Sequence, residues 1–64
     1  MVIALESPFL TTEEAAGYLR IEAKTLHNMR WRGQGPNYHK HGGRVFYHVR
    51  GLLRWSLENR IKLQ

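Results

Sequence analysis

Hydrophobic and polar positions near the start of the chain follow the pattern of a short helix. Thr11 and Glu14 have the spacing of a capping box, in which each side chain accepts a hydrogen bond from the other residue's backbone amide. A helix from about Thr12 to Arg20 would bury three apolar side chains, those of Ala15, Ala16 and Leu19. Small residues at positions 15 and 16 would let a second helix cross close by.

A second helical pattern runs from about Ala23 to Arg32 and is stopped by the glycines and proline of residues 33–36. Leu26 and Met29, with Thr25 in part, are predicted to face the core. A separate stripe with helical spacing is polar, basic and aromatic at once, and consists of Lys24, His27, Asn28 and Trp31. This stripe is the best candidate for a recognition surface.

The next segment has the alternating pattern of a β-hairpin. Residues 38–41 and 44–49 are two β-prone runs, and Gly42-Gly43 between them supplies the positive φ values that tight hairpin turns require. The side chains of Val45, Tyr47 and Val49 are expected on the inner face, with Phe46 and His48 on the other.

A last helix is predicted over roughly Gly51 to Leu63, with Leu52, Trp55 and Ser56 on one side. A second apolar stripe of this helix consists of Leu53, Leu57 and Ile61. It is expected to close the core from below, or alternatively to form a protein–protein surface. The opening apolar residues are expected to add an edge strand to this domain or to another copy. The candidates for protein interaction are therefore Val2, Ile3, Leu53, Leu57 and Ile61.

Length and composition indicate one small folded domain. The chain has 64 residues, 42% of them hydrophobic, and no cysteine for a disulfide or thiolate metal site. We expect a single domain over residues 1–64, with a core at about 10–57 and tails at 1–9 and 58–64. No apolar run approaches the roughly 18 residues of a membrane span, and the start does not resemble a signal peptide. A cytoplasmic protein, associated with the nucleoid of a bacterial host, is expected.

Positive charge is concentrated in the middle of the chain. The net charge is +5, and between Arg20 and Arg50 seven basic residues are opposed only by Glu22. Such a segment attracts a polyanion and speeds encounter with it. Nucleic acid is the usual partner of such a segment, and an anionic membrane surface is the competing one. We expect nucleic acid and no membrane.

The order of these elements matches a known family. Two helices, a turn, a glycine-tipped hairpin and a third helix make a winged helix-turn-helix, a small α+β fold. The chain resembles the small excisionase-like branch of the MerR-type winged-helix proteins. The stretches that carry the resemblance are Leu10–Ala16, Thr25–Pro36, Gly42–Tyr47, and Leu52 with Trp55. The resemblance implies sequence-specific binding of double-stranded DNA, with the second helix in the major groove and the wing along the backbone or minor groove.

Several positions depart from the family pattern. Family members usually carry Gly and Ser where this chain has Arg20 and Glu22, so its second helix is expected to have a weaker cap. The last helix usually opens with an acidic cap, whereas here the pair is Arg50-Gly51, and that helix start is expected to fray.

The candidate DNA contacts divide by chemistry. Asn28 has the amide geometry for a bidentate contact to adenine, and Lys24 and His27 lie on the same stripe. The remaining basic candidates are phosphate or minor-groove contacts: Arg30, Arg32, Lys40, His41 and Arg44. Trp31 is expected to pack against the wing near Tyr38 and Phe46, with a place beside the DNA backbone as the alternative.

Metal binding and catalysis receive little support from the pattern. His39 and His41, with His27 or His48, have neither cysteine nor a nearby carboxylate to complete a metal site. No catalytic set or phosphate-binding glycine loop is evident. We therefore expect a non-enzymatic protein without metal or cofactor.

Two functions share this DNA-binding mode. The first is an excisionase, or recombination directionality factor, which binds repeated sites cooperatively, bends DNA and contacts an integrase. The second is a small transcriptional regulator with no recombinase partner. A module that binds only proteins is a third class, and it would show no salt-sensitive DNA binding.

Overall fold

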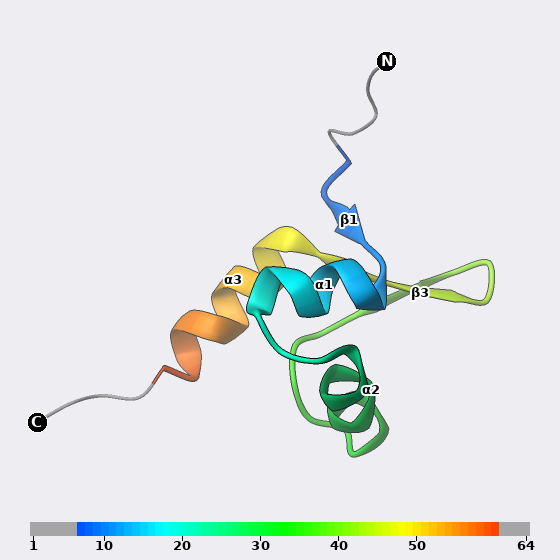
Figure 1. Cartoon of the computed structure of the whole chain (residues 1–64). Helices are drawn as coiled ribbons and strands as arrows, with labels where there is room; N and C mark the ends of the chain where they lie inside the picture. The colour runs from blue at the N-terminus through cyan, green and yellow to red at the C-terminus, as the bar shows by residue number, and fades with distance from the viewer. Residues whose placement is uncertain (1–6, 61–64) are drawn as a thin grey trace, which may run out of the picture.

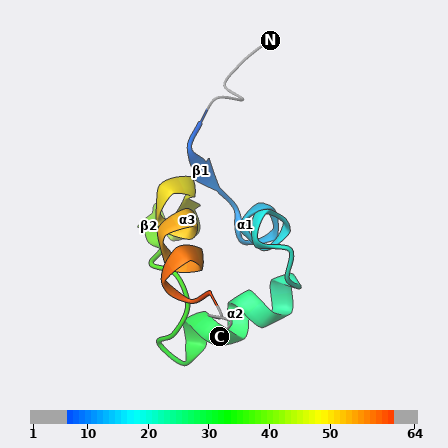
Figure 2. The same ribbon diagram turned by 90° about the vertical axis from the view of Figure 1, so that its left-hand side faces the viewer.

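A computed structural model describes residues 7–60 of the chain. Within these residues, three helices and a three-stranded antiparallel sheet form a small α+β domain, which confirms the predicted fold class (Figure 1). Their order is β1 (Phe9–Leu10), α1 (Thr12–Leu19), α2 (Ala23–Trp31), β2 (His39–His41), β3 (Arg44–His48) and α3 (Val49–Glu58). Seen along α1, α3 lies beside α1 and α2 runs below them (Figure 2).

The capping box at the start of α1 is present as predicted. Thr11 Oγ1 accepts from the Glu14 amide at 3.1 Å, and Glu14 Oε1 accepts from the Thr11 amide at 2.9 Å. The turn to α2 passes through Arg20, whose backbone is left-handed at φ 61°. Glu22 precedes α2 without a side-chain capping bond, so the weaker second cap is confirmed.

The wing is the hairpin of β2 and β3, joined by the predicted glycine pair. Gly42 and Gly43 have φ values of 58° and 83°, the positive values that this tight turn demands. The sheet is larger than the predicted hairpin, because β1 pairs with the other edge of β3. Phe9 lies opposite His48, and Leu10 opposite Tyr47. The apolar residues Val2 and Ile3 lie outside the described part of the chain.

Helix α3 begins two residues before the predicted start. His48 is its N-cap, and Nδ1 of its imidazole accepts from the Arg50 amide at 3.1 Å. Val49 is therefore the first residue of α3 and not the last inner residue of the hairpin, which corrects the prediction. The helix ends at Glu58, short of the predicted Leu63. The side chain of His48 therefore caps α3, in the absence of the acidic cap that was expected from the resemblance.

The core lies where α1, α2, β3 and α3 meet. Its buried side chains are those of Ala15, Ala16, Leu26, Tyr47 and Leu52. Met29, Leu19 and Val45 pack against this cluster from the faces predicted for them, but remain partly exposed. Thr25, which was expected to face the core in part, is exposed.

The second stripe of α3 does not close the core. Leu53 is 49% exposed and Leu57 is 55% exposed, so the expectation that they close the core is wrong. Leu52 alone of the α3 leucines reaches the buried cluster, because the i, i+4 stripe of Leu53 and Leu57 is turned to solvent. Ile61 lies outside the described residues. Within residues 7–60, no helix has both the length and the apolar character to cross a membrane.

Candidate nucleic-acid interface

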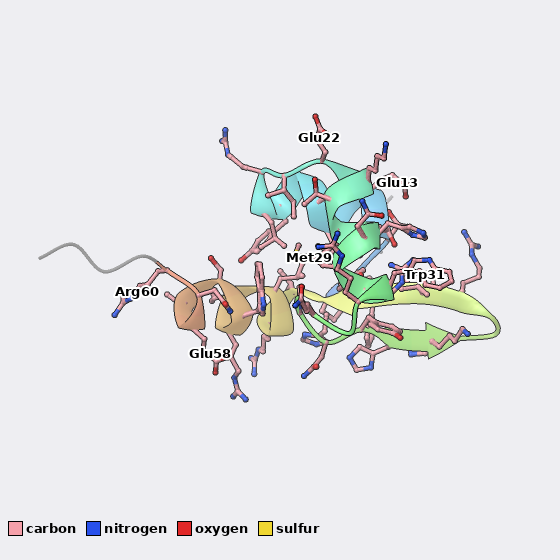
Figure 3. The ribbon with its side chains drawn as sticks, turned by 90° about the horizontal axis from the view of Figure 1, so that it is seen from below. Glu13, Glu22, Met29, Trp31, Glu58 and Arg60 are labelled. Carbon is pink, nitrogen blue, oxygen red and sulfur yellow. The ribbon has the colours of Figure 1, made fainter. Side chains whose placement is uncertain are left out.

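An open hollow lies between the start of α1, one face of α2 and one edge of β3. Only Tyr47 and His48 of β3 pair with β1, so the edge of β3 at Arg44–Phe46 is left without that partner. The residues lining the hollow are Thr11, Thr12, Glu13, Ala23, Lys24, His27, Arg30, Arg44, Val45 and Phe46. Viewed from below, α2 lies across the middle of the molecule with the wing extending to one side and α3 to the other (Figure 3).

The hollow brings predicted contacts from helix and wing together. Lys24 from α2 and Arg44 from the wing tip both line it, and both are exposed. Asn28 is exposed one helical turn after Lys24, on the predicted stripe, although it does not line the hollow. Glu13, from the first turn of α1, is the acidic residue in this lining. Exposed cations from two elements thus line the same hollow.

Arg30 is engaged within the fold. Its Nη1 donates to Tyr47 OH at 3.0 Å and to Thr12 Oγ1 at 3.4 Å, which joins α2 to β3 and α1. Its guanidinium carbon lies 5.7 Å from the centroid of the Tyr38 ring, a cation–π arrangement. That Arg30 contacts a phosphate of DNA stays a prediction. Its observed contacts fix how α2 sits against the sheet, and this was missed because helical periodicity does not report cross-element contacts.

His27 is fixed by the same arginine. Arg30 Nη2 lies 2.9 Å from Nδ1 of the imidazole, one helical turn earlier. The imidazole is exposed and lines the hollow beside Lys24. His27 therefore lies on the exposed face of α2, as the predicted stripe requires. Helical spacing could not predict the contact with Arg30 that orients its ring.

Trp31 does not pack against the wing, which corrects the sequence-based expectation. Its side chain is 79% exposed at the last position of α2 (Figure 3). The place beside the sheet is taken by Tyr38, whose ring centroid lies 6.2 Å from that of the buried Tyr47. The alternative prediction, an indole free to lie beside DNA, is compatible with this exposure.

The remaining candidates surround α2 and the wing. Arg32 follows α2 directly and is exposed, as are Lys40 and His41 on β2. Arg44 has its guanidinium carbon 5.9 Å from the centroid of Phe46, so the wing tip offers a cation supported by an aromatic ring. These exposed cations leave the basic charge of the central segment accessible.

A cluster of one phenyl and three imidazole rings on the outer face of the sheet was not predicted from the sequence. Phe9 meets His39, His41 and His48 edge-on, with ring centroids 5.5, 5.2 and 5.2 Å away. The alternation of His39 and His41 signals one shared face, but the partner Phe9 lies about thirty positions earlier and depends on β1. No group of three or more histidines and carboxylates in residues 7–60 is arranged to hold a metal ion. The contacts of Phe9 with these imidazoles join β1 to the wing.

Comparison with known proteins completes the description of this surface. No curated protein matched the chain. The model of a family described as "Helix-turn-helix domain" matches residues 9–60, which span every helix and strand described above. On that match, together with the α1–turn–α2 pair and its wing, the chain belongs to the helix-turn-helix domain family, a family of DNA-binding domains that includes excisionase-like proteins.

Proposed function

We propose that this chain binds double-stranded DNA sequence-specifically, with α2 in the major groove and the wing against the backbone or minor groove. The observation that carries the proposal is that Lys24 and Arg44, from α2 and the wing, line one hollow. A duplex that enters this hollow meets both cations at once. The major groove admits an α-helix, and the exposed stripe of α2 supplies the side chains to read it.

The proposed contacts have different tasks. Asn28 reads a base edge, since its amide can donate to and accept from adenine together. Lys24, Arg32 and Lys40 neutralise phosphates, which fixes position and contributes affinity without sequence information. Arg44 enters the minor groove at the wing tip, where narrow A·T tracts concentrate negative potential.

The finer proposal is an excisionase that bends DNA and acts with an integrase. Bending a site of 20–30 base pairs costs on the order of 1–6 kcal/mol, and one small module contributes limited binding surface. Several copies bound side by side would offset that cost. The exposed Leu53 and Leu57 of α3 support this proposal, because they offer an apolar contact for a neighbouring copy or an integrase.

The DNA-binding mode is tested by selecting binding sites from random duplexes and titrating the selected duplex over a range of salt. Log affinity is expected to fall linearly with log salt, with a slope of about −0.9 per phosphate neutralised. Lys24→Ala and Arg44→Ala should each reduce the slope by about one unit, whereas Arg54→Ala on α3 serves as the matched control. A flat salt response would favour a module that binds only proteins.

Base reading and recombination need separate measurements. Asn28→Ala should weaken the selected site more than random DNA, and an equal loss on both would show that Asn28 reads no base. Excision is measured with a candidate cognate integrase, with and without the protein. A promoter response without any change in recombination direction would identify a transcriptional regulator instead.

A further inference from the structure

The contact between Arg30 and His27 restricts the chemistry that His27 can offer. Nη2 of Arg30 is 2.9 Å from Nδ1 of His27, a hydrogen-bond distance. A guanidinium carries only N–H donors and no acceptor. The Nδ1 atom must therefore accept, and in a neutral imidazole the proton then resides on Nε2.

Arg30 is well placed to hold this arrangement. Its Nη1 donates to Tyr47 OH, from a residue with no exposed surface, and to Thr12 Oγ1 on α1. The ring of Tyr38 lies against the same guanidinium. Four groups from three elements and a loop thus contact the guanidinium. These contacts favour the orientation in which Nη2 of Arg30 meets Nδ1 of His27.

We propose that Arg30 is a positioning residue that holds His27 as an Nε2–H donor for a hydrogen-bond acceptor on DNA. This inference rests on the proposed function. The two ring nitrogens diverge, so that with Nδ1 held by Arg30, Nε2 points away from the guanidinium, and the ring borders the hollow beside Lys24. His27 then offers one donor of fixed polarity to the duplex.

Fixed polarity gives His27 a defined selectivity. Phosphate oxygens are acceptors, and in the major groove purine N7, guanine O6 and thymine O4 are also acceptors. Cytosine presents only its N4 amino donor there. A base opposite His27 can accordingly be any except cytosine, whereas a phosphate contact would show no base preference.

The tautomer is measured first, on the free protein. Long-range ¹⁵N–¹H correlation spectra at neutral pH distinguish the two tautomers, and comparison with His27→Gln assigns the His27 signals among those of the four histidines. We expect the Nε2–H form of His27. A predominant Nδ1–H form, or an even mixture, would overturn the proposal. Arg30→Met should convert the single form into a mixture, and if that variant does not fold, the wild-type spectrum decides alone.

The consequence for DNA binding is measured with two isosteric variants. The amide of Gln reaches about as far as Nε2, while that of Asn reaches only about as far as Nδ1. His27→Gln should therefore stay close to wild type, and His27→Asn should lose about fivefold in affinity, the equivalent of one ordinary hydrogen bond. Equal effects of the two substitutions would contradict a contact made through Nε2.

Modified duplexes distinguish the two sources of the acceptor. Removing one base acceptor at a time should abolish the difference between wild type and His27→Asn at a base-edge contact. Purine N7 is removed with the 7-deaza analogue, guanine O6 with 2-aminopurine, and thymine O4 with 5-methyl-2-pyrimidinone. A methylphosphonate scan should abolish the difference at a phosphate contact. If neither scan reduces the difference, the acceptor contact is refuted. If wild-type protein binds no duplex at all, the proposed function fails, while the tautomer held by Arg30 can still be read from the spectra.

Discussion

Arg20 occupies a backbone conformation that suits glycine. Among residues 7–60 it is the one non-glycine residue with positive φ, at φ 61° and ψ 41°. The conformation is needed because Arg20 ends α1, where its amide bonds to the carbonyls of Ala16 and Gly17. For a residue with a Cβ atom this costs roughly 1–2 kcal/mol. The turn between α1 and α2 is thus closed at some expense in stability.

Replacing Arg20 with Gly is expected to stabilise the domain by about 1 kcal/mol, since part of the steric gain is offset by the greater freedom of glycine in the unfolded chain. Urea unfolding should show a higher midpoint with an unchanged slope. Arg54→Gly is the matched control, because it removes the same side chain from an exposed helical position. That control should destabilise by about 1 kcal/mol. Equal effects at both positions would show that charge, and not backbone geometry, dominates.

Glu13 is expected to lower the affinity of the proposed interface for DNA. It lines the hollow beside Lys24 and Arg44, while its neighbour Glu14 is held in the capping box. A carboxylate there repels phosphate, so Glu13→Gln should tighten DNA binding by roughly threefold at low salt, with the gain shrinking as salt rises. Fluorescence anisotropy on a labelled duplex measures the change.

The control for this effect is Glu58→Gln. Glu58 lies at the end of α3, on the side of the molecule away from Glu13 (Figure 3). Glu58→Gln changes the net charge by the same amount as Glu13→Gln. A similar gain in DNA affinity from both variants would therefore mean that total charge, and not the position of Glu13 in the hollow, governs affinity.

At the scale of elements, the wing depends on its turn. Gly43 has a φ of 83° with open space around its Cβ position, whereas Gly51 lies in α3 with equal space and no positive φ. Gly43→Ala should therefore destabilise the domain by about 1 kcal/mol or more through backbone strain. Gly51→Ala should stabilise it by roughly 0.5–1 kcal/mol, because alanine is the better helix former.

The two glycine variants can be compared directly in thermal unfolding, since they add the same methyl group. Opposite shifts of the melting temperature are expected. Loss of stability in both would indicate that the methyl group disturbs packing at Gly51, contrary to the space seen there.

Elements with strong local signals were predictable from the sequence. The cap of Thr11 and Glu14 placed the start of α1, and the glycine pair placed the wing turn. The start of α3 was missed because histidine is not among the usual capping residues, and His48 reads locally as a strand residue. Strand β1 was missed because two residues are too few for a period, and only pairing with β3 defines it.

The candidate site was predictable in its exposure but not in its contacts. Helical spacing correctly put Lys24, His27 and Asn28 on the exposed side of α2. It could not show that Arg30 reaches Tyr47 and Thr12, since those bonds join residues 17 and 18 positions apart. Periodicity describes the faces of one element, whereas the orientation of a long side chain depends on its neighbours in space.

At the scale of the whole molecule, the charged wing and the apolar stripe of α3 extend in different directions from α2. Arg44 lies at the wing tip, while Leu53 and Leu57 lie on α3, which extends to the other side (Figure 3). A duplex held by α2 and the wing would leave α3 open to a neighbouring protein. This separation of surfaces predicts that a substitution on α3 alters protein contacts without altering DNA contacts.

The double substitution Leu53→Gln with Leu57→Gln tests that separation. Both side chains are about half exposed, so each substitution should lower the free energy of unfolding by no more than about 1 kcal/mol. Glutamine also preserves helix propensity. Affinity for a duplex with one selected site should stay within about twofold, whereas cooperative binding to two adjacent sites should be lost. Ser56→Ala, exposed on the same helix, is the control and should leave both measurements unchanged. Cooperativity that survives the double substitution would exclude α3 as the contact between copies, and a parallel loss on the single site would show that α3 shapes the DNA interface itself.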